Sequence, residues 1–328
     1  MGNIDILLAT YNGEKFIKEQ IDSILNQTYQ DFNLIISDDC SKDGTRDILK
    51  EYEKKDSRIK VFFQSKNLGY VKNFEFLLNE VESEYYMLSD QDDVWLPEKI
   101  EKSYNCLIDN KADLVFSDLE VVDRKLNTTF KSFNDLMKYT KKAKKYEDYR
   151  LEYLYNCVTG CTLLTKSKFL KKILPLPNES EYVIHDFWIP LIVSMNGKVK
   201  YLNEPLIKYR QHGHNQVGAK TKGNGYKRFE DMRNHFIQVK TEIFETYVKN
   251  DRAFPEKLKK LNHKSLEYFK DIKTKEKINF KGWGVFHKLY KNDSLYFYMS
   301  NFLIFNLPCL GKVIFNLRLK LKGKNNGK

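Results

Sequence analysis

The sequence predicts an α/β fold, a mostly parallel doubly wound sheet followed by a helical C-terminal region. Three observations lead to this fold class. Short apolar runs alternate with amphipathic segments over the first 120 residues, each run ends in polar residues, and the last third has helical periodicity. Continuous apolar runs are typical of strands buried on both faces, and strand–helix–strand repeats form right-handed crossovers.

The apolar runs predict strands at residues 4–9, 32–37, 59–63, 85–88 and 114–116. Helical patterns lie between them, at residues 14–27, 45–54, 71–81 and 97–108. The first of these helices places Ile17, Ile21 and Ile24 on one face. Further along, His185 opens an apolar helix that Gly197 ends, two strands are expected at 199–202 and 206–209, and helices at 226–249 and 255–272.

Two weakly patterned stretches interrupt these elements. Residues 123–149 are rich in lysine and poorly periodic, which predicts an exposed excursion. Three glycines, Gly218, Gly223 and Gly225, indicate a boundary between a domain at 1–219 and a basic helical region at 220–328.

The charge of the chain is divided between these two regions. The 328 residues carry a net charge of +12, yet residues 220–328 hold 25 Lys and Arg against 10 Asp and Glu, a net +15. The first 219 residues are therefore slightly acidic, which argues against a nucleic-acid-binding surface there. A hydrophobic content of 41% excludes a disordered chain.

The cysteines and the N-terminal residues indicate the cellular compartment in which the protein is expected. Five scattered cysteines form no zinc-type set, since the closest two are Cys157 and Cys161, and we interpret them as reduced thiols. The N-terminus has no signal-peptide pattern. We therefore expect a cytoplasmic protein.

Polar loops follow the first four predicted strands, beginning at Thr10, Asp38, Ser65 and Asp90. Ligands of doubly wound sheets bind at the carboxyl ends of the strands, so these loops should line one site. Neither a GxxxxGK[ST] loop nor a GxGxxG loop is present, which argues against P-loop and ordinary dinucleotide chemistry.

The most informative loop contains three aspartates, Asp90, Asp92 and Asp93. Carboxylates this close repel one another unless a cation, hydrogen-bond donors or solvent compensate them. A divalent cation that bridges to a substrate phosphate fits such a cluster. The alternative is that the aspartates cap the helix that begins near Pro97.

The order and spacing of five motifs resemble the family 2 inverting glycosyltransferases with a GT-A fold. The motifs are ILLATYNG at 6–13, ISDDCSKDGT at 36–45, NLG at 67–69, LSDQDDVW at 88–95, and His185-Asp186 with the later Tyr209-Arg210-Gln211-His212. The SDQDDVW form is most similar to the bacterial rhamnosyltransferase-like branch. The resemblance covers residues 3–218.

The resemblance implies a nucleotide-sugar site and a metal cofactor. The nucleotide would contact a set of polar residues, namely Thr10, Tyr11, Asn12, Asp38, Asp39, Asn67, Asp90 and Arg210. A Mn²⁺ or Mg²⁺ ion would be bound by Asp92, with Asp90 and His212 as further candidates. A bound metal stabilises the charge that develops on the departing nucleoside diphosphate.

The resemblance also implies that Asp186 is the general base, which takes the proton of the acceptor hydroxyl. Many relatives have an acidic residue where this chain has His185, which we place with Trp188 on the acceptor side. Two structural alternatives stay open: Asp186 capping its helix, and Trp188 packing in the core. A solvated loop is the alternative for His212.

The C-terminal region suggests attachment to a membrane surface. Residues 294–311 carry no charge and are rich in aromatic side chains, and lysines follow at Lys312, Lys320, Lys322 and Lys324. Asn301, Asn306 and Pro308 make this segment a poor spanning helix. An interfacial helix on an anionic membrane is expected, with a helical hairpin or a dimer contact as the alternative.

Together these features predict a metal-dependent inverting glycosyltransferase on the inner face of the cell membrane. It would transfer a sugar from a dTDP- or UDP-sugar to a saccharide acceptor, and the branch resemblance implies that the sugar is rhamnose. The acceptor could be a lipid-linked glycan. The reaction would belong to the synthesis of a bacterial cell-surface polysaccharide, such as cell wall or capsule. The alternatives are a sugar-nucleotide pyrophosphorylase and a non-catalytic membrane- or polyanion-binding protein on the same scaffold.

Overall fold

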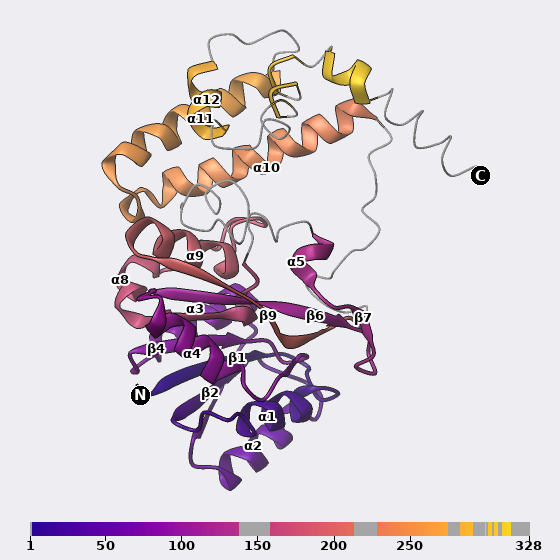
Figure 1. Ribbon diagram of the computed structural model, residues 1–328, viewed down its shortest axis with the longest axis vertical. Helices are drawn as coiled ribbons and strands as arrows, with labels where there is room; N and C mark the ends of the chain where they lie inside the picture. The colour runs from indigo at the N-terminus through magenta and orange to yellow at the C-terminus, as the bar shows by residue number, and fades with distance from the viewer. Residues whose placement is uncertain are drawn as a thin grey trace, which may run out of the picture. The chain divides into compact units, whose positions relative to one another are not determined.

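The computed structural model describes residues 2–137, 158–212, 228–274, 283–290, 299, 301–303, 305–307 and 310–315. The chain divides into two units (Figure 1). Unit 1 comprises residues 1–178 and 183–221, and unit 2 comprises residues 179–182 and 222–328.

Unit 1 is built from strands and helices that alternate along the chain. The strands are β1 (Ile4–Thr10), β2 (Phe32–Asp38), β3 (Ile59–Phe63), β4 (Tyr85–Ser89), β5 (Val94–Trp95), β6 (Leu114–Val122), β7 (Thr128–Phe130), β8 (Leu163–Lys166) and β9 (Val199–Arg210). The helices are α1 (Ile17–Leu25), α2 (Thr45–Lys55), α3 (Tyr70–Asn79), α4 (Lys99–Asp109), α5 (Phe133–Leu136), α8 (Leu170–Ile173) and α9 (His185–Asn196), with 3-10 turns at Gly160–Thr162 and Ser167–Phe169.

These strands form one nine-stranded sheet in the order β3-β2-β1-β4-β8-β6-β9-β5, with β7 paired to β6. The strands β3, β2, β1 and β4 are parallel, whereas β8 is antiparallel to both β4 and β6. The strand order reverses at β1, which lies between β2 and β4. This switch point places the loops after β1, β2 and β4 around one crevice.

The predicted α/β fold with a helical C-terminal region is confirmed. The β1 strand is almost wholly buried because apolar residues face both layers, and Ile17, Ile21 and Ile24 of α1 pack into the same core. One expectation is wrong, because residues 199–202 and 206–209 belong to the single strand β9. Register shifts around the pairing of Asp118 with Pro205 let the strand pass the proline.

The predicted excursion at 123–149 is only partly within the described residues. Its first part contains β7 and the short helix α5, whose Ser132 hydroxyl accepts a hydrogen bond from the Asp135 amide at 3.0 Å. Residues 138–157, including Cys157, lie outside the described part of the chain.

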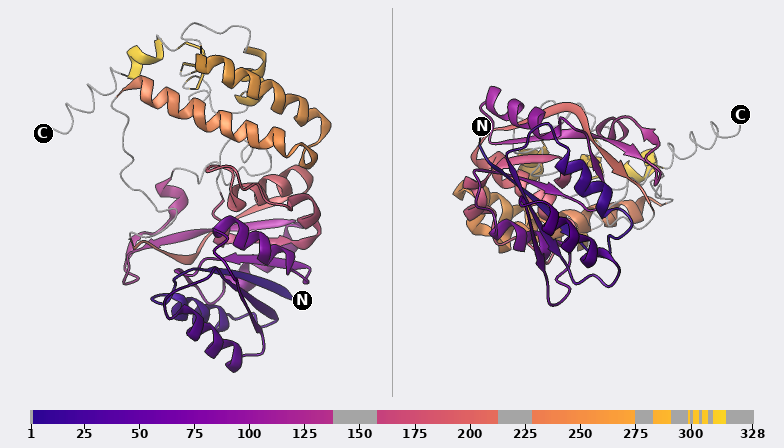
Figure 2. Two further views of the ribbon diagram at one scale, coloured as in Figure 1. Left: turned by 180° about the vertical axis from the view of Figure 1, so that it is seen from behind. Right: turned by 90° about the horizontal axis from the view of Figure 1, so that it is seen from below.

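Unit 2 contains the helices α10 (Phe229–Lys249), α11 (Glu256–Thr274) and α12 (Trp283–Tyr290), with a 3-10 turn at Asp251–Ala253. The helices α10 and α11 run alongside each other (Figure 2, left). Their interface is aromatic: the rings of Phe244 and Phe269 stack with centroids 5.6 Å apart. Within the described residues, no helix is long and apolar enough to cross a membrane.

Candidate active site

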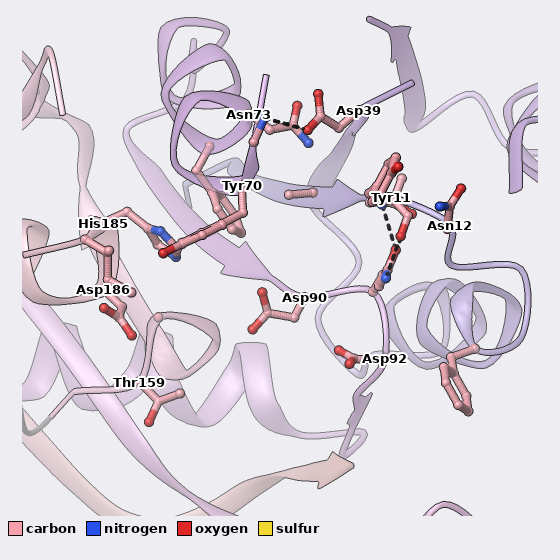
Figure 3. A pocket seen from close by; sticks show the side chains of 18 of the residues that line it. Tyr11, Asn12, Asp39, Tyr70, Asn73, Asp90, Asp92, Thr159, His185 and Asp186 are labelled. Carbon is pink, nitrogen blue, oxygen red and sulfur yellow. Dashed lines mark hydrogen bonds between the residues drawn. The ribbon is translucent and has the colours of Figure 1, made fainter. Parts of the chain in front are cut away.

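A cavity of ≈ 1120 Å³ opens at the carboxyl ends of β1, β2 and β4 in unit 1. Figure 3 shows the acidic side chains of Asp90 and Asp92 between Tyr11 on one side and Asp186 on the other. Most of the predicted site residues line it, namely Thr10, Tyr11, Asn12, Asp39, Asn67, Asp90, Asp92, His185, Asp186 and His212. Asp38, Trp188 and Arg210 are not among the lining residues.

The loop after β1 is tied to the acidic loop by Gln91. Its Oε1 accepts hydrogen bonds from the Thr10 hydroxyl at 2.6 Å and from the Tyr11 amide at 2.9 Å, while its Nε2 donates to the Tyr11 carbonyl. Asn12, with φ of 51°, accepts a bond at Oδ1 from the Lys42 amide. Sequence analysis missed the role of Gln91, although its position between two aspartates was a signal.

The loop after β2 is organised by Asp39. Its carboxylate accepts hydrogen bonds from the amides of Leu68 at 2.6 Å and Gly69 at 2.9 Å, and the Asn67 side chain donates to its carbonyl at 3.1 Å. Gly69 has a φ of +80°, which glycine adopts without strain. Asp39 and Asn67 therefore hold the loops after β2 and β3 together at the wall of the cavity.

Asp38, which we expected at the nucleotide, is not among the residues that line the cavity. Its side chain is fully buried, and its Oδ2 accepts bonds from Arg46 Nε at 2.7 Å and from the Ser41 amide at 3.1 Å. Asp38 thus stabilises the turn that presents Asp39, and it does not reach the cavity.

The acidic loop places Asp90 and Asp92 at the cavity and Asp93 behind it. Burial, followed by the negative charges of Asp92 and Asp186, raises the pKa of Asp90 to about 7. Burial likewise raises the pKa of Asp93, whose Oδ1 accepts a bond from the Arg210 amide at 3.1 Å. None of the three aspartates caps α4, because Glu98 is its N-cap residue.

Cys161 lies against Asp90 and Asp93, with ligand atoms of the three residues within 4.8 Å of one another. Burial raises the pKa of the Cys161 thiol, so at neutral pH the thiol is protonated and donates a hydrogen bond to the Asp93 carboxyl. A protonated thiol is a poor metal ligand. The groups that could hold a hard divalent cation are therefore the carboxylates that face the cavity.

His212 completes this arrangement from the end of β9. Its Nε2 lies 2.7 Å from Oδ2 of Asp92, and its ring stacks on Phe16 with centroids 4.7 Å apart. Carboxylate oxygens and an imidazole nitrogen form a donor set that suits Mn²⁺. Asp92 and His212 are therefore neighbours at the cavity, whereas the carboxylate of Asp90, which also lines it, is grouped with Asp93 and Cys161.

Arg210, which we expected to contact the diphosphate, does not line the cavity. The side chain is 2% exposed, and its guanidinium donates to the carbonyls of Asp92 and Arg124, each at 2.9 Å, and to the Glu19 carboxylate. The guanidinium also lies over the Phe16 ring, 4.8 Å from its centroid. Arg210 therefore holds the acidic loop in place from behind.

Asp186 and His185 begin α9 at the opposite end of the cavity from Tyr11 (Figure 3). The N-cap residue of α9 is Ile184, so Asp186 does not cap the helix. Trp188, which we expected on the acceptor side, does not line the cavity: it is 1% exposed, and its indole Nε1 donates to the Ile173 carbonyl at 2.9 Å. Trp188 packs in the core, because it lies on the buried face of α9.

Several lining residues carried no local sequence signal. They come from α3, α5 and the segment before β8, and comprise Tyr70, Asn73, Phe74, Phe133, Met137, Val158, Thr159 and Gly160. They meet the acidic loop only through the arrangement of the elements around the sheet.

Comparisons with known proteins agree with this architecture. The family model described as glycosyl transferase family 2 matches residues 5–174. The dTDP-rhamnosyl transferase RfbG of Shigella flexneri is 30% identical over 253 residues, which cover 70% of this chain and 81% of that protein.

Two solved structures share the fold at low identity. The crystal structure of S. aureus TarS 1–349 in complex with UDP-GlcNAc aligns with a TM-score of 0.54 at 18% identity, covering 88% of this chain and 79% of that one. The mannosyltransferase PcManGT of Pyrobaculum calidifontis, in complex with GDP-Man and Mn²⁺, aligns with a TM-score of 0.52 at 14% identity. The alignment covers 90% of this chain and 76% of that one. The chain belongs to glycosyl transferase family 2 and is a glycosyltransferase with the GT-A fold.

Proposed function

We propose that this glycosyltransferase transfers a sugar, with inversion and with the help of a divalent cation, from a nucleoside-diphosphate sugar to a saccharide acceptor. One observation carries the proposal: a single cavity brings Asp39, Asp90, Asp92, His212 and Asp186 together. The family assignment removes the pyrophosphorylase alternative. Cell-surface polysaccharide synthesis is the proposed setting, because a relative in Bacillus subtilis, TuaG, is named as a putative teichuronic acid biosynthesis glycosyltransferase.

The nucleotide is proposed to lie at the Tyr11 end of the cavity. Tyr11 is 44% exposed and offers its ring to a base, and Asp39 and Asn67 lie on the wall beside it. Since RfbG is named for dTDP and the TarS complex contains a UDP-sugar, both pyrimidine nucleotides are candidates, and dTDP-L-rhamnose and UDP-hexoses are the proposed donors.

The metal is proposed to be Mn²⁺ or Mg²⁺, held by Asp92 with Asp90 and His212. When bound, it neutralises charge on the leaving nucleoside diphosphate. The protein's own contribution is to fix these side chains, through Gln91 on one side and Arg210 on the other. The Mn²⁺ in the PcManGT complex supports this choice.

The reaction also needs a base, which we propose is Asp186. Its carboxylate would take the proton of an acceptor hydroxyl as that oxygen bonds to the anomeric carbon and the bond to the diphosphate breaks. Such a base contributes roughly 10²–10⁴-fold to the rate. Asp186 lines the cavity in the first turn of α9.

We further propose that residues 1–219 catalyse the reaction and residues 220–328 attach the enzyme to the inner face of the cell membrane. Within unit 2, Leu310 and Val313 are 49% and 55% exposed beside Lys312. Lys312 pairs with Glu230 of α10, so it is partly neutralised. The remaining basic residues of the region would supply the attraction to anionic lipids.

A thermal-shift screen tests the core of the proposal. UDP, dTDP, GDP and their sugars would be titrated with and without Mn²⁺, and nucleoside diphosphate release would be measured in parallel. We expect one nucleotide to raise the melting temperature in a Mn²⁺-dependent way, and Asp92→Asn to remove that dependence. A protein that neither binds nor turns over any of these compounds would instead be the non-catalytic alternative.

A further inference from the structure

An aromatic recess lies at the Asp186 end of the cavity, formed by Tyr70, Phe74 and His185. The His185 ring packs against Phe74 with centroids 4.2 Å apart and meets the Tyr70 ring edge to face at 6.1 Å. Figure 3 shows Tyr70 and His185 next to each other, on the side of Asp90 that faces away from Tyr11. The recess is therefore separate from the nucleotide end.

His185 has hydrogen-bonding capacity that the described residues do not use. It is 7% exposed, and its Nδ1 is buried without a hydrogen-bond partner in the described part of the chain. Burial lowers its pKa to about 3, so the imidazole is neutral and can donate at one nitrogen and accept at the other. A buried polar group without a partner is costly, which calls for a function.

Gly160 lies close against this imidazole. A Cβ added at Gly160 would lie 3.3 Å from Nε2 of His185 and 3.1 Å from Cβ of Asp186. A carbon at these distances would be crowded, so glycine lets the segment before β8 lie close to both side chains, and Gly160, His185 and Asp186 all line the same cavity.

Tyr70 supplies the apolar wall of the recess. It is the first residue of α3, directly after Gly69, and it is 38% exposed. An aromatic ring of this kind packs well against the C–H face of a ligand while polar groups fix the orientation. An apolar wall next to a neutral hydrogen-bonding group matches a sugar ring, and it does not match a phosphate.

We propose that Tyr70, Phe74 and His185 form a subsite for a pyranose ring, which packs on Tyr70 and hydrogen-bonds through one hydroxyl to the His185 imidazole. This inference rests on the proposed transfer of sugar. The ring is either the transferred sugar of the donor or the acceptor sugar, since both must approach Asp186. His185 is then a positioning residue, and it does not take the proton.

The test uses the full chain, Mn²⁺, and the nucleotide sugar and nucleoside diphosphate that the wild type binds. His185→Phe keeps the stacking on Phe74 but removes the hydrogen bond, and His185→Asn restores a polar group. Tyr70→Ala removes the wall, and Tyr70→Phe keeps the ring. We expect His185→Phe and Tyr70→Ala each to raise the KM of one sugar substrate about tenfold, with partial recovery in His185→Asn and Tyr70→Phe.

Two assays identify the source of the ring. A raised KM for donor hydrolysis without acceptor assigns the subsite to the donor sugar, and a raised KM for acceptor alone, at saturating donor, assigns it to the acceptor. Binding of the nucleoside diphosphate should stay within about twofold of wild type. The proposed subsite is refuted if neither KM changes in His185→Phe and Tyr70→Ala, or if their binding of the nucleoside diphosphate weakens in parallel. An inactive wild type would overturn the proposed function instead.

Discussion

Arg210 holds the main chain of Asp92: its Nε donates to the Asp92 carbonyl oxygen at 2.9 Å. The Arg210 amide also donates to Oδ1 of Asp93 at 3.1 Å, so β9 is joined to the acidic loop by backbone and side chain. Because His212 follows two residues later and lies 2.7 Å from Asp92, the end of β9 fixes two candidate metal ligands at once.

Replacing Arg210 by Met should therefore loosen the metal site and destabilise the fold. The change removes donors from the carbonyls of Asp92 and Arg124, and we expect a loss of about 2–4 kcal/mol in the free energy of unfolding. Mn²⁺ affinity should fall at least tenfold, since a loosened acidic loop must be ordered on binding. Urea denaturation and Mn²⁺ titration by electron paramagnetic resonance measure both effects.

Glu19→Gln is the matched control for Arg210. Glu19 also pairs with the guanidinium, but its side chain is 54% exposed. Exposed pairs contribute little, so the unfolding free energy should change by less than about 1 kcal/mol. Equal losses in Glu19→Gln and Arg210→Met would show that the ion pair, and not the bonds to the acidic loop, carries the effect.

Asp186→Asn should abolish transfer and leave nucleotide binding intact. The amide keeps the shape of the side chain but cannot accept a proton, so kcat should fall about 10²–10⁴-fold. Calorimetric titration with the nucleoside diphosphate and Mn²⁺ provides the control, because Asp186 lies at the other end of the cavity from Tyr11. Loss of nucleotide binding would indicate a structural role for Asp186.

The sequence predicted the sheet and the loops at its edge because their signals are local. Apolar runs bounded by polar clusters locate β1, β2 and β4. The apolar run that follows His185 and ends at Gly197 likewise predicts α9 and places His185 and Asp186 at its start. The sequence did not distinguish polar residues that face the cavity from those that support the loops behind it. Arg210 looks like a phosphate ligand in the sequence, yet the packing of β9 beside the acidic loop turns its guanidinium toward main-chain carbonyls.

The residues that sequence analysis missed depend on distant elements. Gln91 contacts Thr10 across 81 positions, because β1 and β4 are neighbours in the sheet. Tyr70, which was not predicted, meets the predicted His185 through the packing of α3 and α9 around the same cavity. Such contacts depend on which strands and helices are neighbours in the fold. A single sequence does not predict these contacts for individual residues.

Metal binding should weaken in acid because of Asp90. Burial and the charges of Asp92 and Asp186 raise its pKa to about 7, so the metal-free carboxyl is protonated below that pH. A cation must displace this proton, and the apparent affinity should fall by up to tenfold per pH unit below about 7. Mn²⁺ titrations from pH 5.5 to 8.5 measure this dependence, and Asp90→Asn should flatten it.

The Asp90 carboxyl should also make the stability of the metal-free protein depend on pH. A carboxyl whose folded pKa is raised favours the folded state at low pH, and this contribution is lost as the pH rises from about 4 to about 7. Added Mn²⁺ should compensate the ionised carboxyl, so the stabilisation by metal should be larger at pH 8 than at pH 6. A metal effect independent of pH would contradict the assignment of Asp90.

Attachment to anionic membranes should depend on the exposed apolar side chains of unit 2. Leu310 and Val313 are 49% and 55% exposed, and each would contribute about 1.5–3 kcal/mol if fully buried in the interface. Leu310→Asp with Val313→Asp should therefore lower sedimentation with phosphatidylglycerol vesicles at least tenfold. Phe236→Asp, at a 37% exposed position of α10, adds the same kind of charge elsewhere and should bind as the wild type does. Unchanged sedimentation of the double variant, with a changed oligomeric state, would show that this surface is a dimer contact.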